Sequence, residues 1–433
     1  MGTTKDNTTK SEKPISIKEL RQADTFIRPT RKYSLSSVTP KVKHSIFSSK
    51  VQLLIFAVLL YAHVNHFNYF AHPTNPLISD LRMAIFGMSL VLTYLCYIFL
   101  PETSKGRGAW FWKLVQAVTF TYAMNALFWL FLSKENLQYF LENVVDERLG
   151  KPLPERDYAT HCEFYTPDHP TSYFGHFTAN IDMFASAHFV GWMFKVWIMR
   201  NHTLAWVMSI GFEMMEYSFE VFLPNFKECW WDHWLLDVFG CNLIGMIIGF
   251  YTIRKFNMRR LFWFMAPSEK MDKMTLWQQT KYLFTSREEY IREDKWHWLA
   301  EPWTFNAIIW YMVLNMGTDL SYFFVKSQID MPPPHWVFAI RIWVLGFFTI
   351  LVSNDYYDYV VDRKCNSMTL PIFLHHVILI VEWLMFFKNM KRNILLTTAN
   401  LFDPSFYPEV KAFWAAFFLL VVGGLLLLLF HSI

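Results

Sequence analysis

The sequence predicts an all-α polytopic integral membrane protein, and two observations lead to this fold class. Hydrophobic residues make up 53% of the 433 residues and charged residues only 18%, with 43 Phe and 19 Trp. This composition leaves little polar surface for a soluble domain, and abundant Trp and Tyr are typical of membrane interfaces. The second observation is a series of apolar stretches of about 20 residues, the length that an α-helix needs to cross a bilayer.

About ten transmembrane helices are expected from these stretches. They lie at about 47–66, 82–100, 109–133, 182–199, 203–223, 233–253, 303–326, 335–353, 367–387 and 411–431. Residues 1–45 are expected to form a basic cytosolic tail, and residues 46–431 a single membrane-embedded domain. An even number of spans places both termini on the same side of the membrane, and the basic tail indicates the cytosol.

The charges of the loops agree with this topology in two places. Residues 134–176, expected to be lumenal, contain eight acids and four bases, whereas residues 254–300, expected to be cytosolic, contain ten bases and six acids. The segment with Lys388, Lys391 and Arg392 is expected to be lumenal and departs from the rule. The loop 254–300 is expected to contain short amphipathic helices, either on the membrane surface or as ordinary cytosolic linkers.

The stretch from Asp182 to Asp237 is apolar enough for a bilayer and yet rich in ionisable residues. A charged group at membrane depth costs roughly 2.5–3.5 kcal/mol on insertion scales, so several together indicate a site within the helical bundle. Glu213, Glu216 and Glu220 follow the spacing i, i+3, i+7 and therefore share one face of a helix. By the topology above, the break at Pro224 lies near the lumenal side.

Carboxylates continue beyond this break, with Glu228 and Asp232 four residues apart and Asp237 further along. Clustered carboxylates are hard oxygen ligands that suit calcium, magnesium or manganese, and no histidine–cysteine set is expected to compete for zinc. A calcium-rich lumen would favour Ca2+. The alternative interpretation is that Glu220 or Asp237 reaches the membrane interface or pairs with Lys227.

His188 lies in the middle of the span that precedes the acids, and Asp182 lies near its membrane edge. A histidine beside a bound divalent cation is suited to act as a general base on a hydroxyl group or water. The alternative is a packed, hydrogen-bonded histidine with no chemical role.

Three motifs resemble those of the eukaryotic base-exchange phosphatidylserine synthases. The longest is LPNFxECWWD, which runs from Leu223 to Asp232 and continues to Leu236 and Asp237; the others are His188-Phe189-x-Gly191-Trp192 and Glu213-x-x-Glu216. The resemblance is strongest over about 176–260 and beyond 300 is mainly one of span layout. The sequence departs from these relatives at Val190 and Phe212, which bears on the shape of the pocket.

This resemblance implies a calcium-dependent enzyme of the endoplasmic reticulum membrane. Such an enzyme replaces the head group of phosphatidylcholine or phosphatidylethanolamine with L-serine. Carried over by motif, the resemblance implies His188 as the catalytic base, and Glu213, Glu216, Glu228 and Asp232 as Ca2+ ligands. Asn225 and Asp237 are expected to support the substrate, and Asp182 is added as a substrate-binding residue because of its position. Such enzymes can be homodimers, although no interface is predicted.

Cys162 and Cys229 both match the family and both fall on segments expected to be lumenal, where disulfides form. We therefore predict a Cys162–Cys229 bridge that holds the acidic loop over the site. The alternative is two free thiols.

Two other functions are alternatives to base exchange. Phosphatidyltransferases that use a CDP-activated lipid carry a DGxxAR signature, which is absent here. A polytopic ion or lipid transporter would use the acids as a permeation site, but transporters often show matching halves, and the acids are concentrated in one region. Within the base-exchange reaction, direct attack by serine and a two-step route through a phosphatidyl-enzyme on His188 both remain open.

Overall fold

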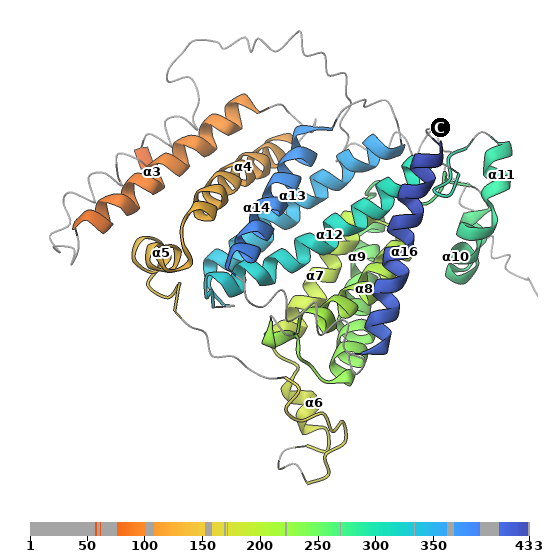
Figure 1. Cartoon of the computed structure of the whole chain (residues 1–433), viewed down its shortest axis with the longest axis horizontal. Coiled ribbons are helices and arrows are strands. Elements are labelled where there is room, and N and C mark those ends of the chain that lie inside the picture. The colour runs from red at the N-terminus through yellow and green to blue at the C-terminus, as the bar shows by residue number, and fades with distance from the viewer. Residues whose placement is uncertain are drawn as a thin grey trace, which may run out of the picture.

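The computed structural model is built from helices (Figure 1). It describes residues 57, 58, 61, 76–100, 108–151, 158–168, 170, 172–220, 223–268, 270–293, 295–300, 302–332, 334–361, 368–389 and 407–431. The expected tail at 1–45 and most of the expected span at 47–66 lie outside these residues. Within them, the only β contact is an isolated bridge between Met265 and His297.

The long helices coincide with the apolar stretches of the sequence. They are α3 (Pro76–Phe99), α4 (Ala109–Phe131), α7 (Met183–Met199), α8 (His202–Phe219), α9 (Leu243–Lys255), α12 (Pro302–Gln328), α13 (Trp336–Val361), α14 (Leu370–Asn389) and α16 (Pro408–His431). An eleven-residue π-helix, η4 (Asp232–Asn242), runs directly into α9.

Five helical segments of the described residues are long and apolar enough to cross a membrane. They are Ala109–Phe131, Asp232–Lys255, Pro302–Gln328, Trp336–Val360 and Leu370–Lys388. Ala84–Phe99 and Met183–Met199 are shorter apolar helices. The structure therefore supports a multi-pass membrane protein, but it does not confirm the count of about ten spans. The helices α8 and α16 lie where spans were expected, and neither is among the five segments that are long and apolar enough to cross a membrane.

Local sequence explains where α7 ends and α8 begins. Arg200 ends α7 in the left-handed region at φ 50°, and its guanidinium donates hydrogen bonds to Trp197 O at 2.8 Å and to Asn354 Oδ1 at 3.0 Å. The side chain of Asn201 then caps α8 by accepting the Leu204 N–H at 3.0 Å. A left-handed residue stops a helix and an Asn cap starts one, so the chain turns back here and places α7 beside α8.

Two glycines allow α9 to approach α7 closely. A Cβ at Gly245 would collide with the carbonyl oxygen of Phe189, and one at Gly249 would lie 2.8 Å from Cβ of Val196. This is the small-xxx-small arrangement that lets helix backbones pack tightly in membranes. The approach fixes the position of η4, which continues into α9, relative to α7.

The remaining segments lie at the edges of the bundle. The short helix α6 (Gly175–Ala179) extends beyond the bundle, whereas α10 (Leu276–Thr285) and α11 (Arg287–Arg292) lie away from α6, at the right of the view (Figure 1). The expected helices in the loop 254–300 are thus present. Leu276, Trp277 and Phe284 of α10 are exposed, which leaves an apolar face available to a membrane surface.

Candidate active site

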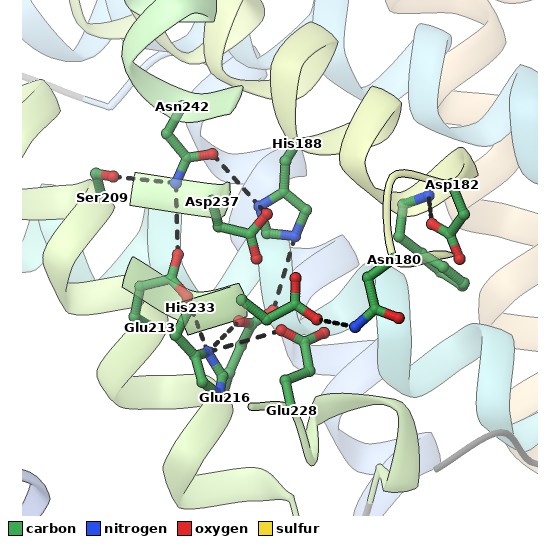
Figure 2. Close-up of polar contacts among 12 residues, drawn as sticks. Asn180, Asp182, His188, Ser209, Glu213, Glu216, Glu228, His233, Asp237 and Asn242 are labelled. Carbon is green, nitrogen blue, oxygen red and sulfur yellow. Dashed lines mark hydrogen bonds and ion pairs between the residues drawn. The ribbon is translucent and has the colours of Figure 1, made fainter. Parts of the chain in front are cut away.

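Three elements bring the central acids and two histidines together inside the bundle (Figure 2). The helix α7 supplies His188, α8 supplies Glu213 and Glu216, and η4 supplies His233 and Asp237, while Glu228 comes from the loop before η4. We call these six residues the acid–histidine cluster. Glu213, Glu216, His233 and Asp237 are each at most 4% exposed. Polar groups buried this deeply require partners or a ligand.

The π-helical form of η4 decides which of its side chains reach the site. In an α-helix, residues five apart point about 140° away from each other. Hydrogen bonds from i to i+5 instead place such residues nearly above one another. Asp232, Asp237 and Asn242 are five residues apart and therefore share one face of η4, with His233 beside them. π-Helical segments occur frequently at functional sites, and here the segment gathers polar groups that an α-helix would separate.

His188 is held by an amide and faces the carboxylates. Its Nδ1 lies 3.3 Å from Oδ1 of Asn242 and 3.7 Å from Oδ1 of Asp237, and its Nε2 lies 4.0 Å from Oε1 of Glu216. The amide nitrogen of Asn242 donates to Ser209 Oγ at 3.1 Å, and it lies 3.4 Å from Glu213 Oε1. Because the amide nitrogen is engaged in this way, Oδ1 faces His188 and accepts the Nδ1 proton, which leaves the lone pair on Nε2.

His233 is the main residue of the site that the sequence analysis overlooked. Its Nδ1 donates to Glu213 Oε2 at 3.1 Å and lies 3.5 Å from Glu216 and 3.8 Å from Glu228. The side chain is completely buried, and its ring contacts that of Tyr217 at 4.1 Å between centroids. Its place in an acid-rich run, four residues before Asp237 and therefore on the same helical face, was a signal in the sequence.

The donor set of the cluster fits a divalent cation. Three overlapping groups of residues each offer three ligand atoms, and within each group these atoms lie within 4.8 Å of one another. The groups are Glu216, Glu228 and Asp237; Glu213, Glu216 and His233; and His188, Glu213 and Asp237. Two buried carboxylate oxygens, Glu216 Oε2 and Glu228 Oε2, have no hydrogen-bond partner among the described residues. The group of Glu216, Glu228 and Asp237 offers only oxygen, which suits a hard cation such as Ca2+.

The loop before α7 covers one edge of the cluster and is tied to it covalently. Cys162 and Cys229 form a disulfide with 5.2 Å between their Cα atoms, which confirms the predicted bridge. Asn180 donates its amide to Asp232 Oδ2 at 2.6 Å. Asp232 is thus buried at the edge of the cluster and belongs to none of its three candidate ligand groups, so its role as a Ca2+ ligand stays a prediction.

Two other acids and one amide of the central stretch have separate places. Asp182 caps α7 by accepting the Phe184 N–H at 2.7 Å and also accepts from Tyr158 Oη at 3.1 Å. Asn225 lies in the 3-10 turn η3 (Pro224–Phe226), with no hydrogen bond to the cluster among the described residues. Substrate binding by Asp182 and Asn225 therefore stays a prediction.

Glu220 ends α8 outside the cluster and lies 3.5 Å from Tyr407 Oη, so the third acid of the i, i+3, i+7 series does not join the first two. Asp237, in contrast, is 4% exposed and does not reach out to an interface. Phe212, one of the departures from the family pattern, places its ring edge-on to that of His188 at 6.3 Å.

The fold and the site together define a multi-pass membrane protein with a polar, cation-compatible centre enclosed by its helices. Comparison with known proteins gives the family. A model described as phosphatidyl serine synthase matches residues 108–390. The chain therefore belongs to the phosphatidylserine synthase family, as the motifs predicted.

Individual relatives agree with this family. CDP-diacylglycerol–serine O-phosphatidyltransferase 1 of Arabidopsis thaliana is 31% identical over 293 residues, which cover 67% of this chain and 68% of the relative. Phosphatidylserine synthase 2 of Homo sapiens is 32% identical over 265 residues, 60% of this chain and 53% of the relative. Phosphatidylserine synthase of Drosophila melanogaster is 30% identical over 55% of this chain and 46% of its own length. These names indicate a phosphatidyltransferase enzyme, and the names from the plant and the animals differ in whether they specify a lipid donor.

Proposed function

We propose that this protein is a calcium-dependent base-exchange phosphatidylserine synthase. It replaces the choline or ethanolamine head group of a phospholipid with L-serine, in the endoplasmic reticulum membrane, with both termini in the cytosol. The acid–histidine cluster is the observation that carries the proposal, because it combines two buried carboxylate oxygens that have no hydrogen-bond partner among the described residues with a histidine that has a free Nε2 lone pair. A phosphodiester exchange needs both a cation and a base.

In this proposal Glu216, Glu228 and Asp237 hold Ca2+, with Glu213 and Asp232 beside them. The bound ion would neutralise charge on the phosphodiester while that group is attacked. The protein contributes the rest. The bundle buries the site away from water, and Asn242 orients His188 so that Nε2 faces the carboxylates.

His188 acts as the general base in the exchange. Nε2 takes the proton of the serine hydroxyl as serine Oγ attacks phosphorus, and a new O–P bond forms. The bond between phosphorus and the oxygen of choline or ethanolamine breaks, and the proton passes to that leaving oxygen. The products are phosphatidylserine and free choline or ethanolamine, so no nucleotide or redox partner is required.

A second donor deserves a direct test, since three plant relatives of about 31% identity are named for CDP-diacylglycerol. The DGxxAR signature of many CDP-lipid enzymes is absent from this sequence. The same base would then deprotonate serine, but CMP would leave in place of an amino alcohol. The two reactions differ in donor and leaving group.

The test is the incorporation of labelled L-serine into lipid by the purified protein in mixed micelles. Phosphatidylcholine, phosphatidylethanolamine and CDP-diacylglycerol are offered separately, each with Ca2+ and with a chelator. Calcium-dependent product from either of the first two lipids supports base exchange. Product from CDP-diacylglycerol alone would refute base exchange and support the CDP-diacylglycerol reaction. No product from any donor would refute both reactions.

A further inference from the structure

A buried lysine of α12 has no counter-ion in the part of the chain that the structure describes. Lys326 is 6% exposed, and its amine makes no hydrogen bond or ion pair with a described residue. Its one recorded contact places Nζ 5.0 Å from the centre of the Phe184 ring. A cation–π contact of this kind compensates only part of the cost of burying an ammonium group. Lysine is seldom buried without a partner, so an anion is the expected missing component.

The position of Phe184 places this amine near His188. Phe184 and His188 are four residues apart on α7 and therefore lie on the same face, one turn from each other. Phe184 also contacts the Tyr158 ring at 6.0 Å, under the loop that the disulfide ties to the site. The amine thus lies at the end of α7 where that loop meets the cluster.

A second lysine on the facing helices shows what is unusual about Lys326. Lys195 of α7 forms an ion pair with Asp319 of α12. Asp319 precedes Lys326 by seven residues, so both point from the same side of α12. Among the described residues, the chain therefore supplies a carboxylate for Lys195 and none for Lys326.

We propose that Lys326 binds an anionic group of a substrate and so forms an anion subsite beside Phe184, which precedes His188 by one turn of α7. This inference rests on the proposed function for the identity of the anion. The carboxylates of the cluster repel anions, and Lys326 offers a positive charge outside the cluster. Two groups share the required chemistry: the carboxylate of L-serine and the phosphodiester of the donor lipid.

With the carboxylate of L-serine on Lys326, the subsite would hold serine on the side of His188 where Phe184 lies, and the serine hydroxyl is the group whose proton His188 takes in the proposed function. The lipid phosphodiester would place phosphorus itself near the amine. The two sources predict changes in different Michaelis constants.

The experiment compares Lys326→Met, Lys326→Gln and Lys326→Arg with wild type. Serine concentration and lipid mole fraction are varied separately in the labelled-serine assay. Lys388→Met is the matched control, because its amine is exposed and donates to the carbonyl oxygens of Leu130 and Leu132, away from the cluster. Thermal unfolding and size-exclusion profiles identify any variant that fails to fold. If Lys326→Met fails to fold, Lys326→Gln, which retains a polar end, takes its place in the comparison.

Loss of one charge-assisted hydrogen bond predicts a rise of about tenfold or more in one KM, with substantial recovery in Lys326→Arg. A rise in the KM for serine assigns the subsite to the carboxylate, and a rise in the KM for lipid assigns it to the phosphodiester. Unchanged KM values, or an equal change in Lys388→Met, would overturn the proposal.

Equilibrium binding of labelled serine, and of the donor lipid, to purified protein with Ca2+ separates this inference from the proposed function. If wild type makes no product from any donor and yet binds one of these ligands through Lys326, the function fails and the subsite stands. If product forms and Lys326→Gln changes neither binding nor KM, the subsite fails and the function stands.

Discussion

Nδ1 of His188 lies 3.3 Å from Oδ1 of Asn242, whose amide nitrogen is engaged by Ser209 and Glu213. This relationship joins α7, α8 and η4 through one amide and fixes the tautomer of the histidine. It assigns separate roles to the two rings of the site. His188 keeps a free Nε2, whereas Nδ1 of His233 is used to bind Glu213.

We expect His188→Ala to lower the rate of serine incorporation by at least about 100-fold, because general-base catalysis contributes factors of this size. The variant should remain folded, since the His188 side chain is at the edge of the cluster and 12% exposed. His376→Ala, on α14, is the control for the loss of an imidazole. Turnover like that of wild type in His188→Ala would remove His188 from the mechanism.

Asn242→Leu should lower kcat by about 10–100-fold, the usual effect of losing a group that orients a catalytic or metal-binding side chain. The acid limb of the pH–rate profile should also move, because the tautomer of His188 is no longer fixed. Asn315→Leu is a matched control, since Asn315 is a buried amide of α12 that donates to its own helix at Tyr311 O. A change in Tm with an unchanged pH profile would indicate a purely structural amide.

Glu216→Gln should weaken the dependence on Ca2+, because Glu216 belongs to two of the three candidate ligand groups and has a buried oxygen without a hydrogen-bond partner. The expected result is a Ca2+ midpoint raised by about tenfold or more, the range seen when groups around a metal are lost. Glu220→Gln, on the same helix but outside the cluster, provides the comparison. An unchanged midpoint in Glu216→Gln would exclude Glu216 as a ligand.

Cys162→Ser and Cys229→Ser should each destabilise the protein by about 2–4 kcal/mol, the typical contribution of a disulfide. Activity should fall as well, because the tethered loop supplies Asn180 to Asp232. Reductant should reproduce the loss in wild type and have no further effect on either variant. Cys96→Ser, which removes a buried free thiol, is the control. If reductant changed the activity of Cys96→Ser and of the two bridge variants equally, the disulfide would not be the tether.

Asp146 gives a pH-dependent prediction outside the membrane-spanning helices. Arg148 donates to its carboxylate at 2.8 Å, and Trp336 and His335 also contact it, so that these groups hold the pKa of Asp146 below its ordinary value. The pKa of Asp146 is therefore lower in the folded state than in the unfolded state, where it is about 3.9. Ionised Asp146 stabilises the fold above about pH 3.9, and this stabilisation is lost as the pH falls through the folded-state pKa.

The difference in Tm between wild type and Asp146→Asn should therefore be largest near neutral pH and should shrink in acid. Thermal unfolding at a series of pH values measures it. A difference that grows as the pH falls would contradict the assignment.

The amino-acid sequence by itself determined the membrane class, the family and most of the site. Apolar stretches as long as a bilayer is thick admit few folds other than a helical bundle, because backbone groups must be satisfied within each segment. The spacing of Glu213 and Glu216 on one helical face and the LPNFxECWWD motif located the cluster, and the matching cysteines predicted the bridge that the structure contains.

Only the tertiary structure decided which residues of this stretch meet. Asn242 joins the site because η4 is π-helical, and a sequence read with the α-helical period does not place it on the face of Asp237. His233, four residues before Asp237, shares that face in either kind of helix. Glu220 is left out because α8 ends at that residue, and Asp182 is used to cap α7. The anion subsite proposed at Lys326 depends on the contact of this side chain on α12 with Phe184 on α7, two residues that are 142 positions apart in the sequence. Local sequence patterns specify the helices, whereas the contacts between helices, set by packing and by the paired charges inside the bundle, specify the site.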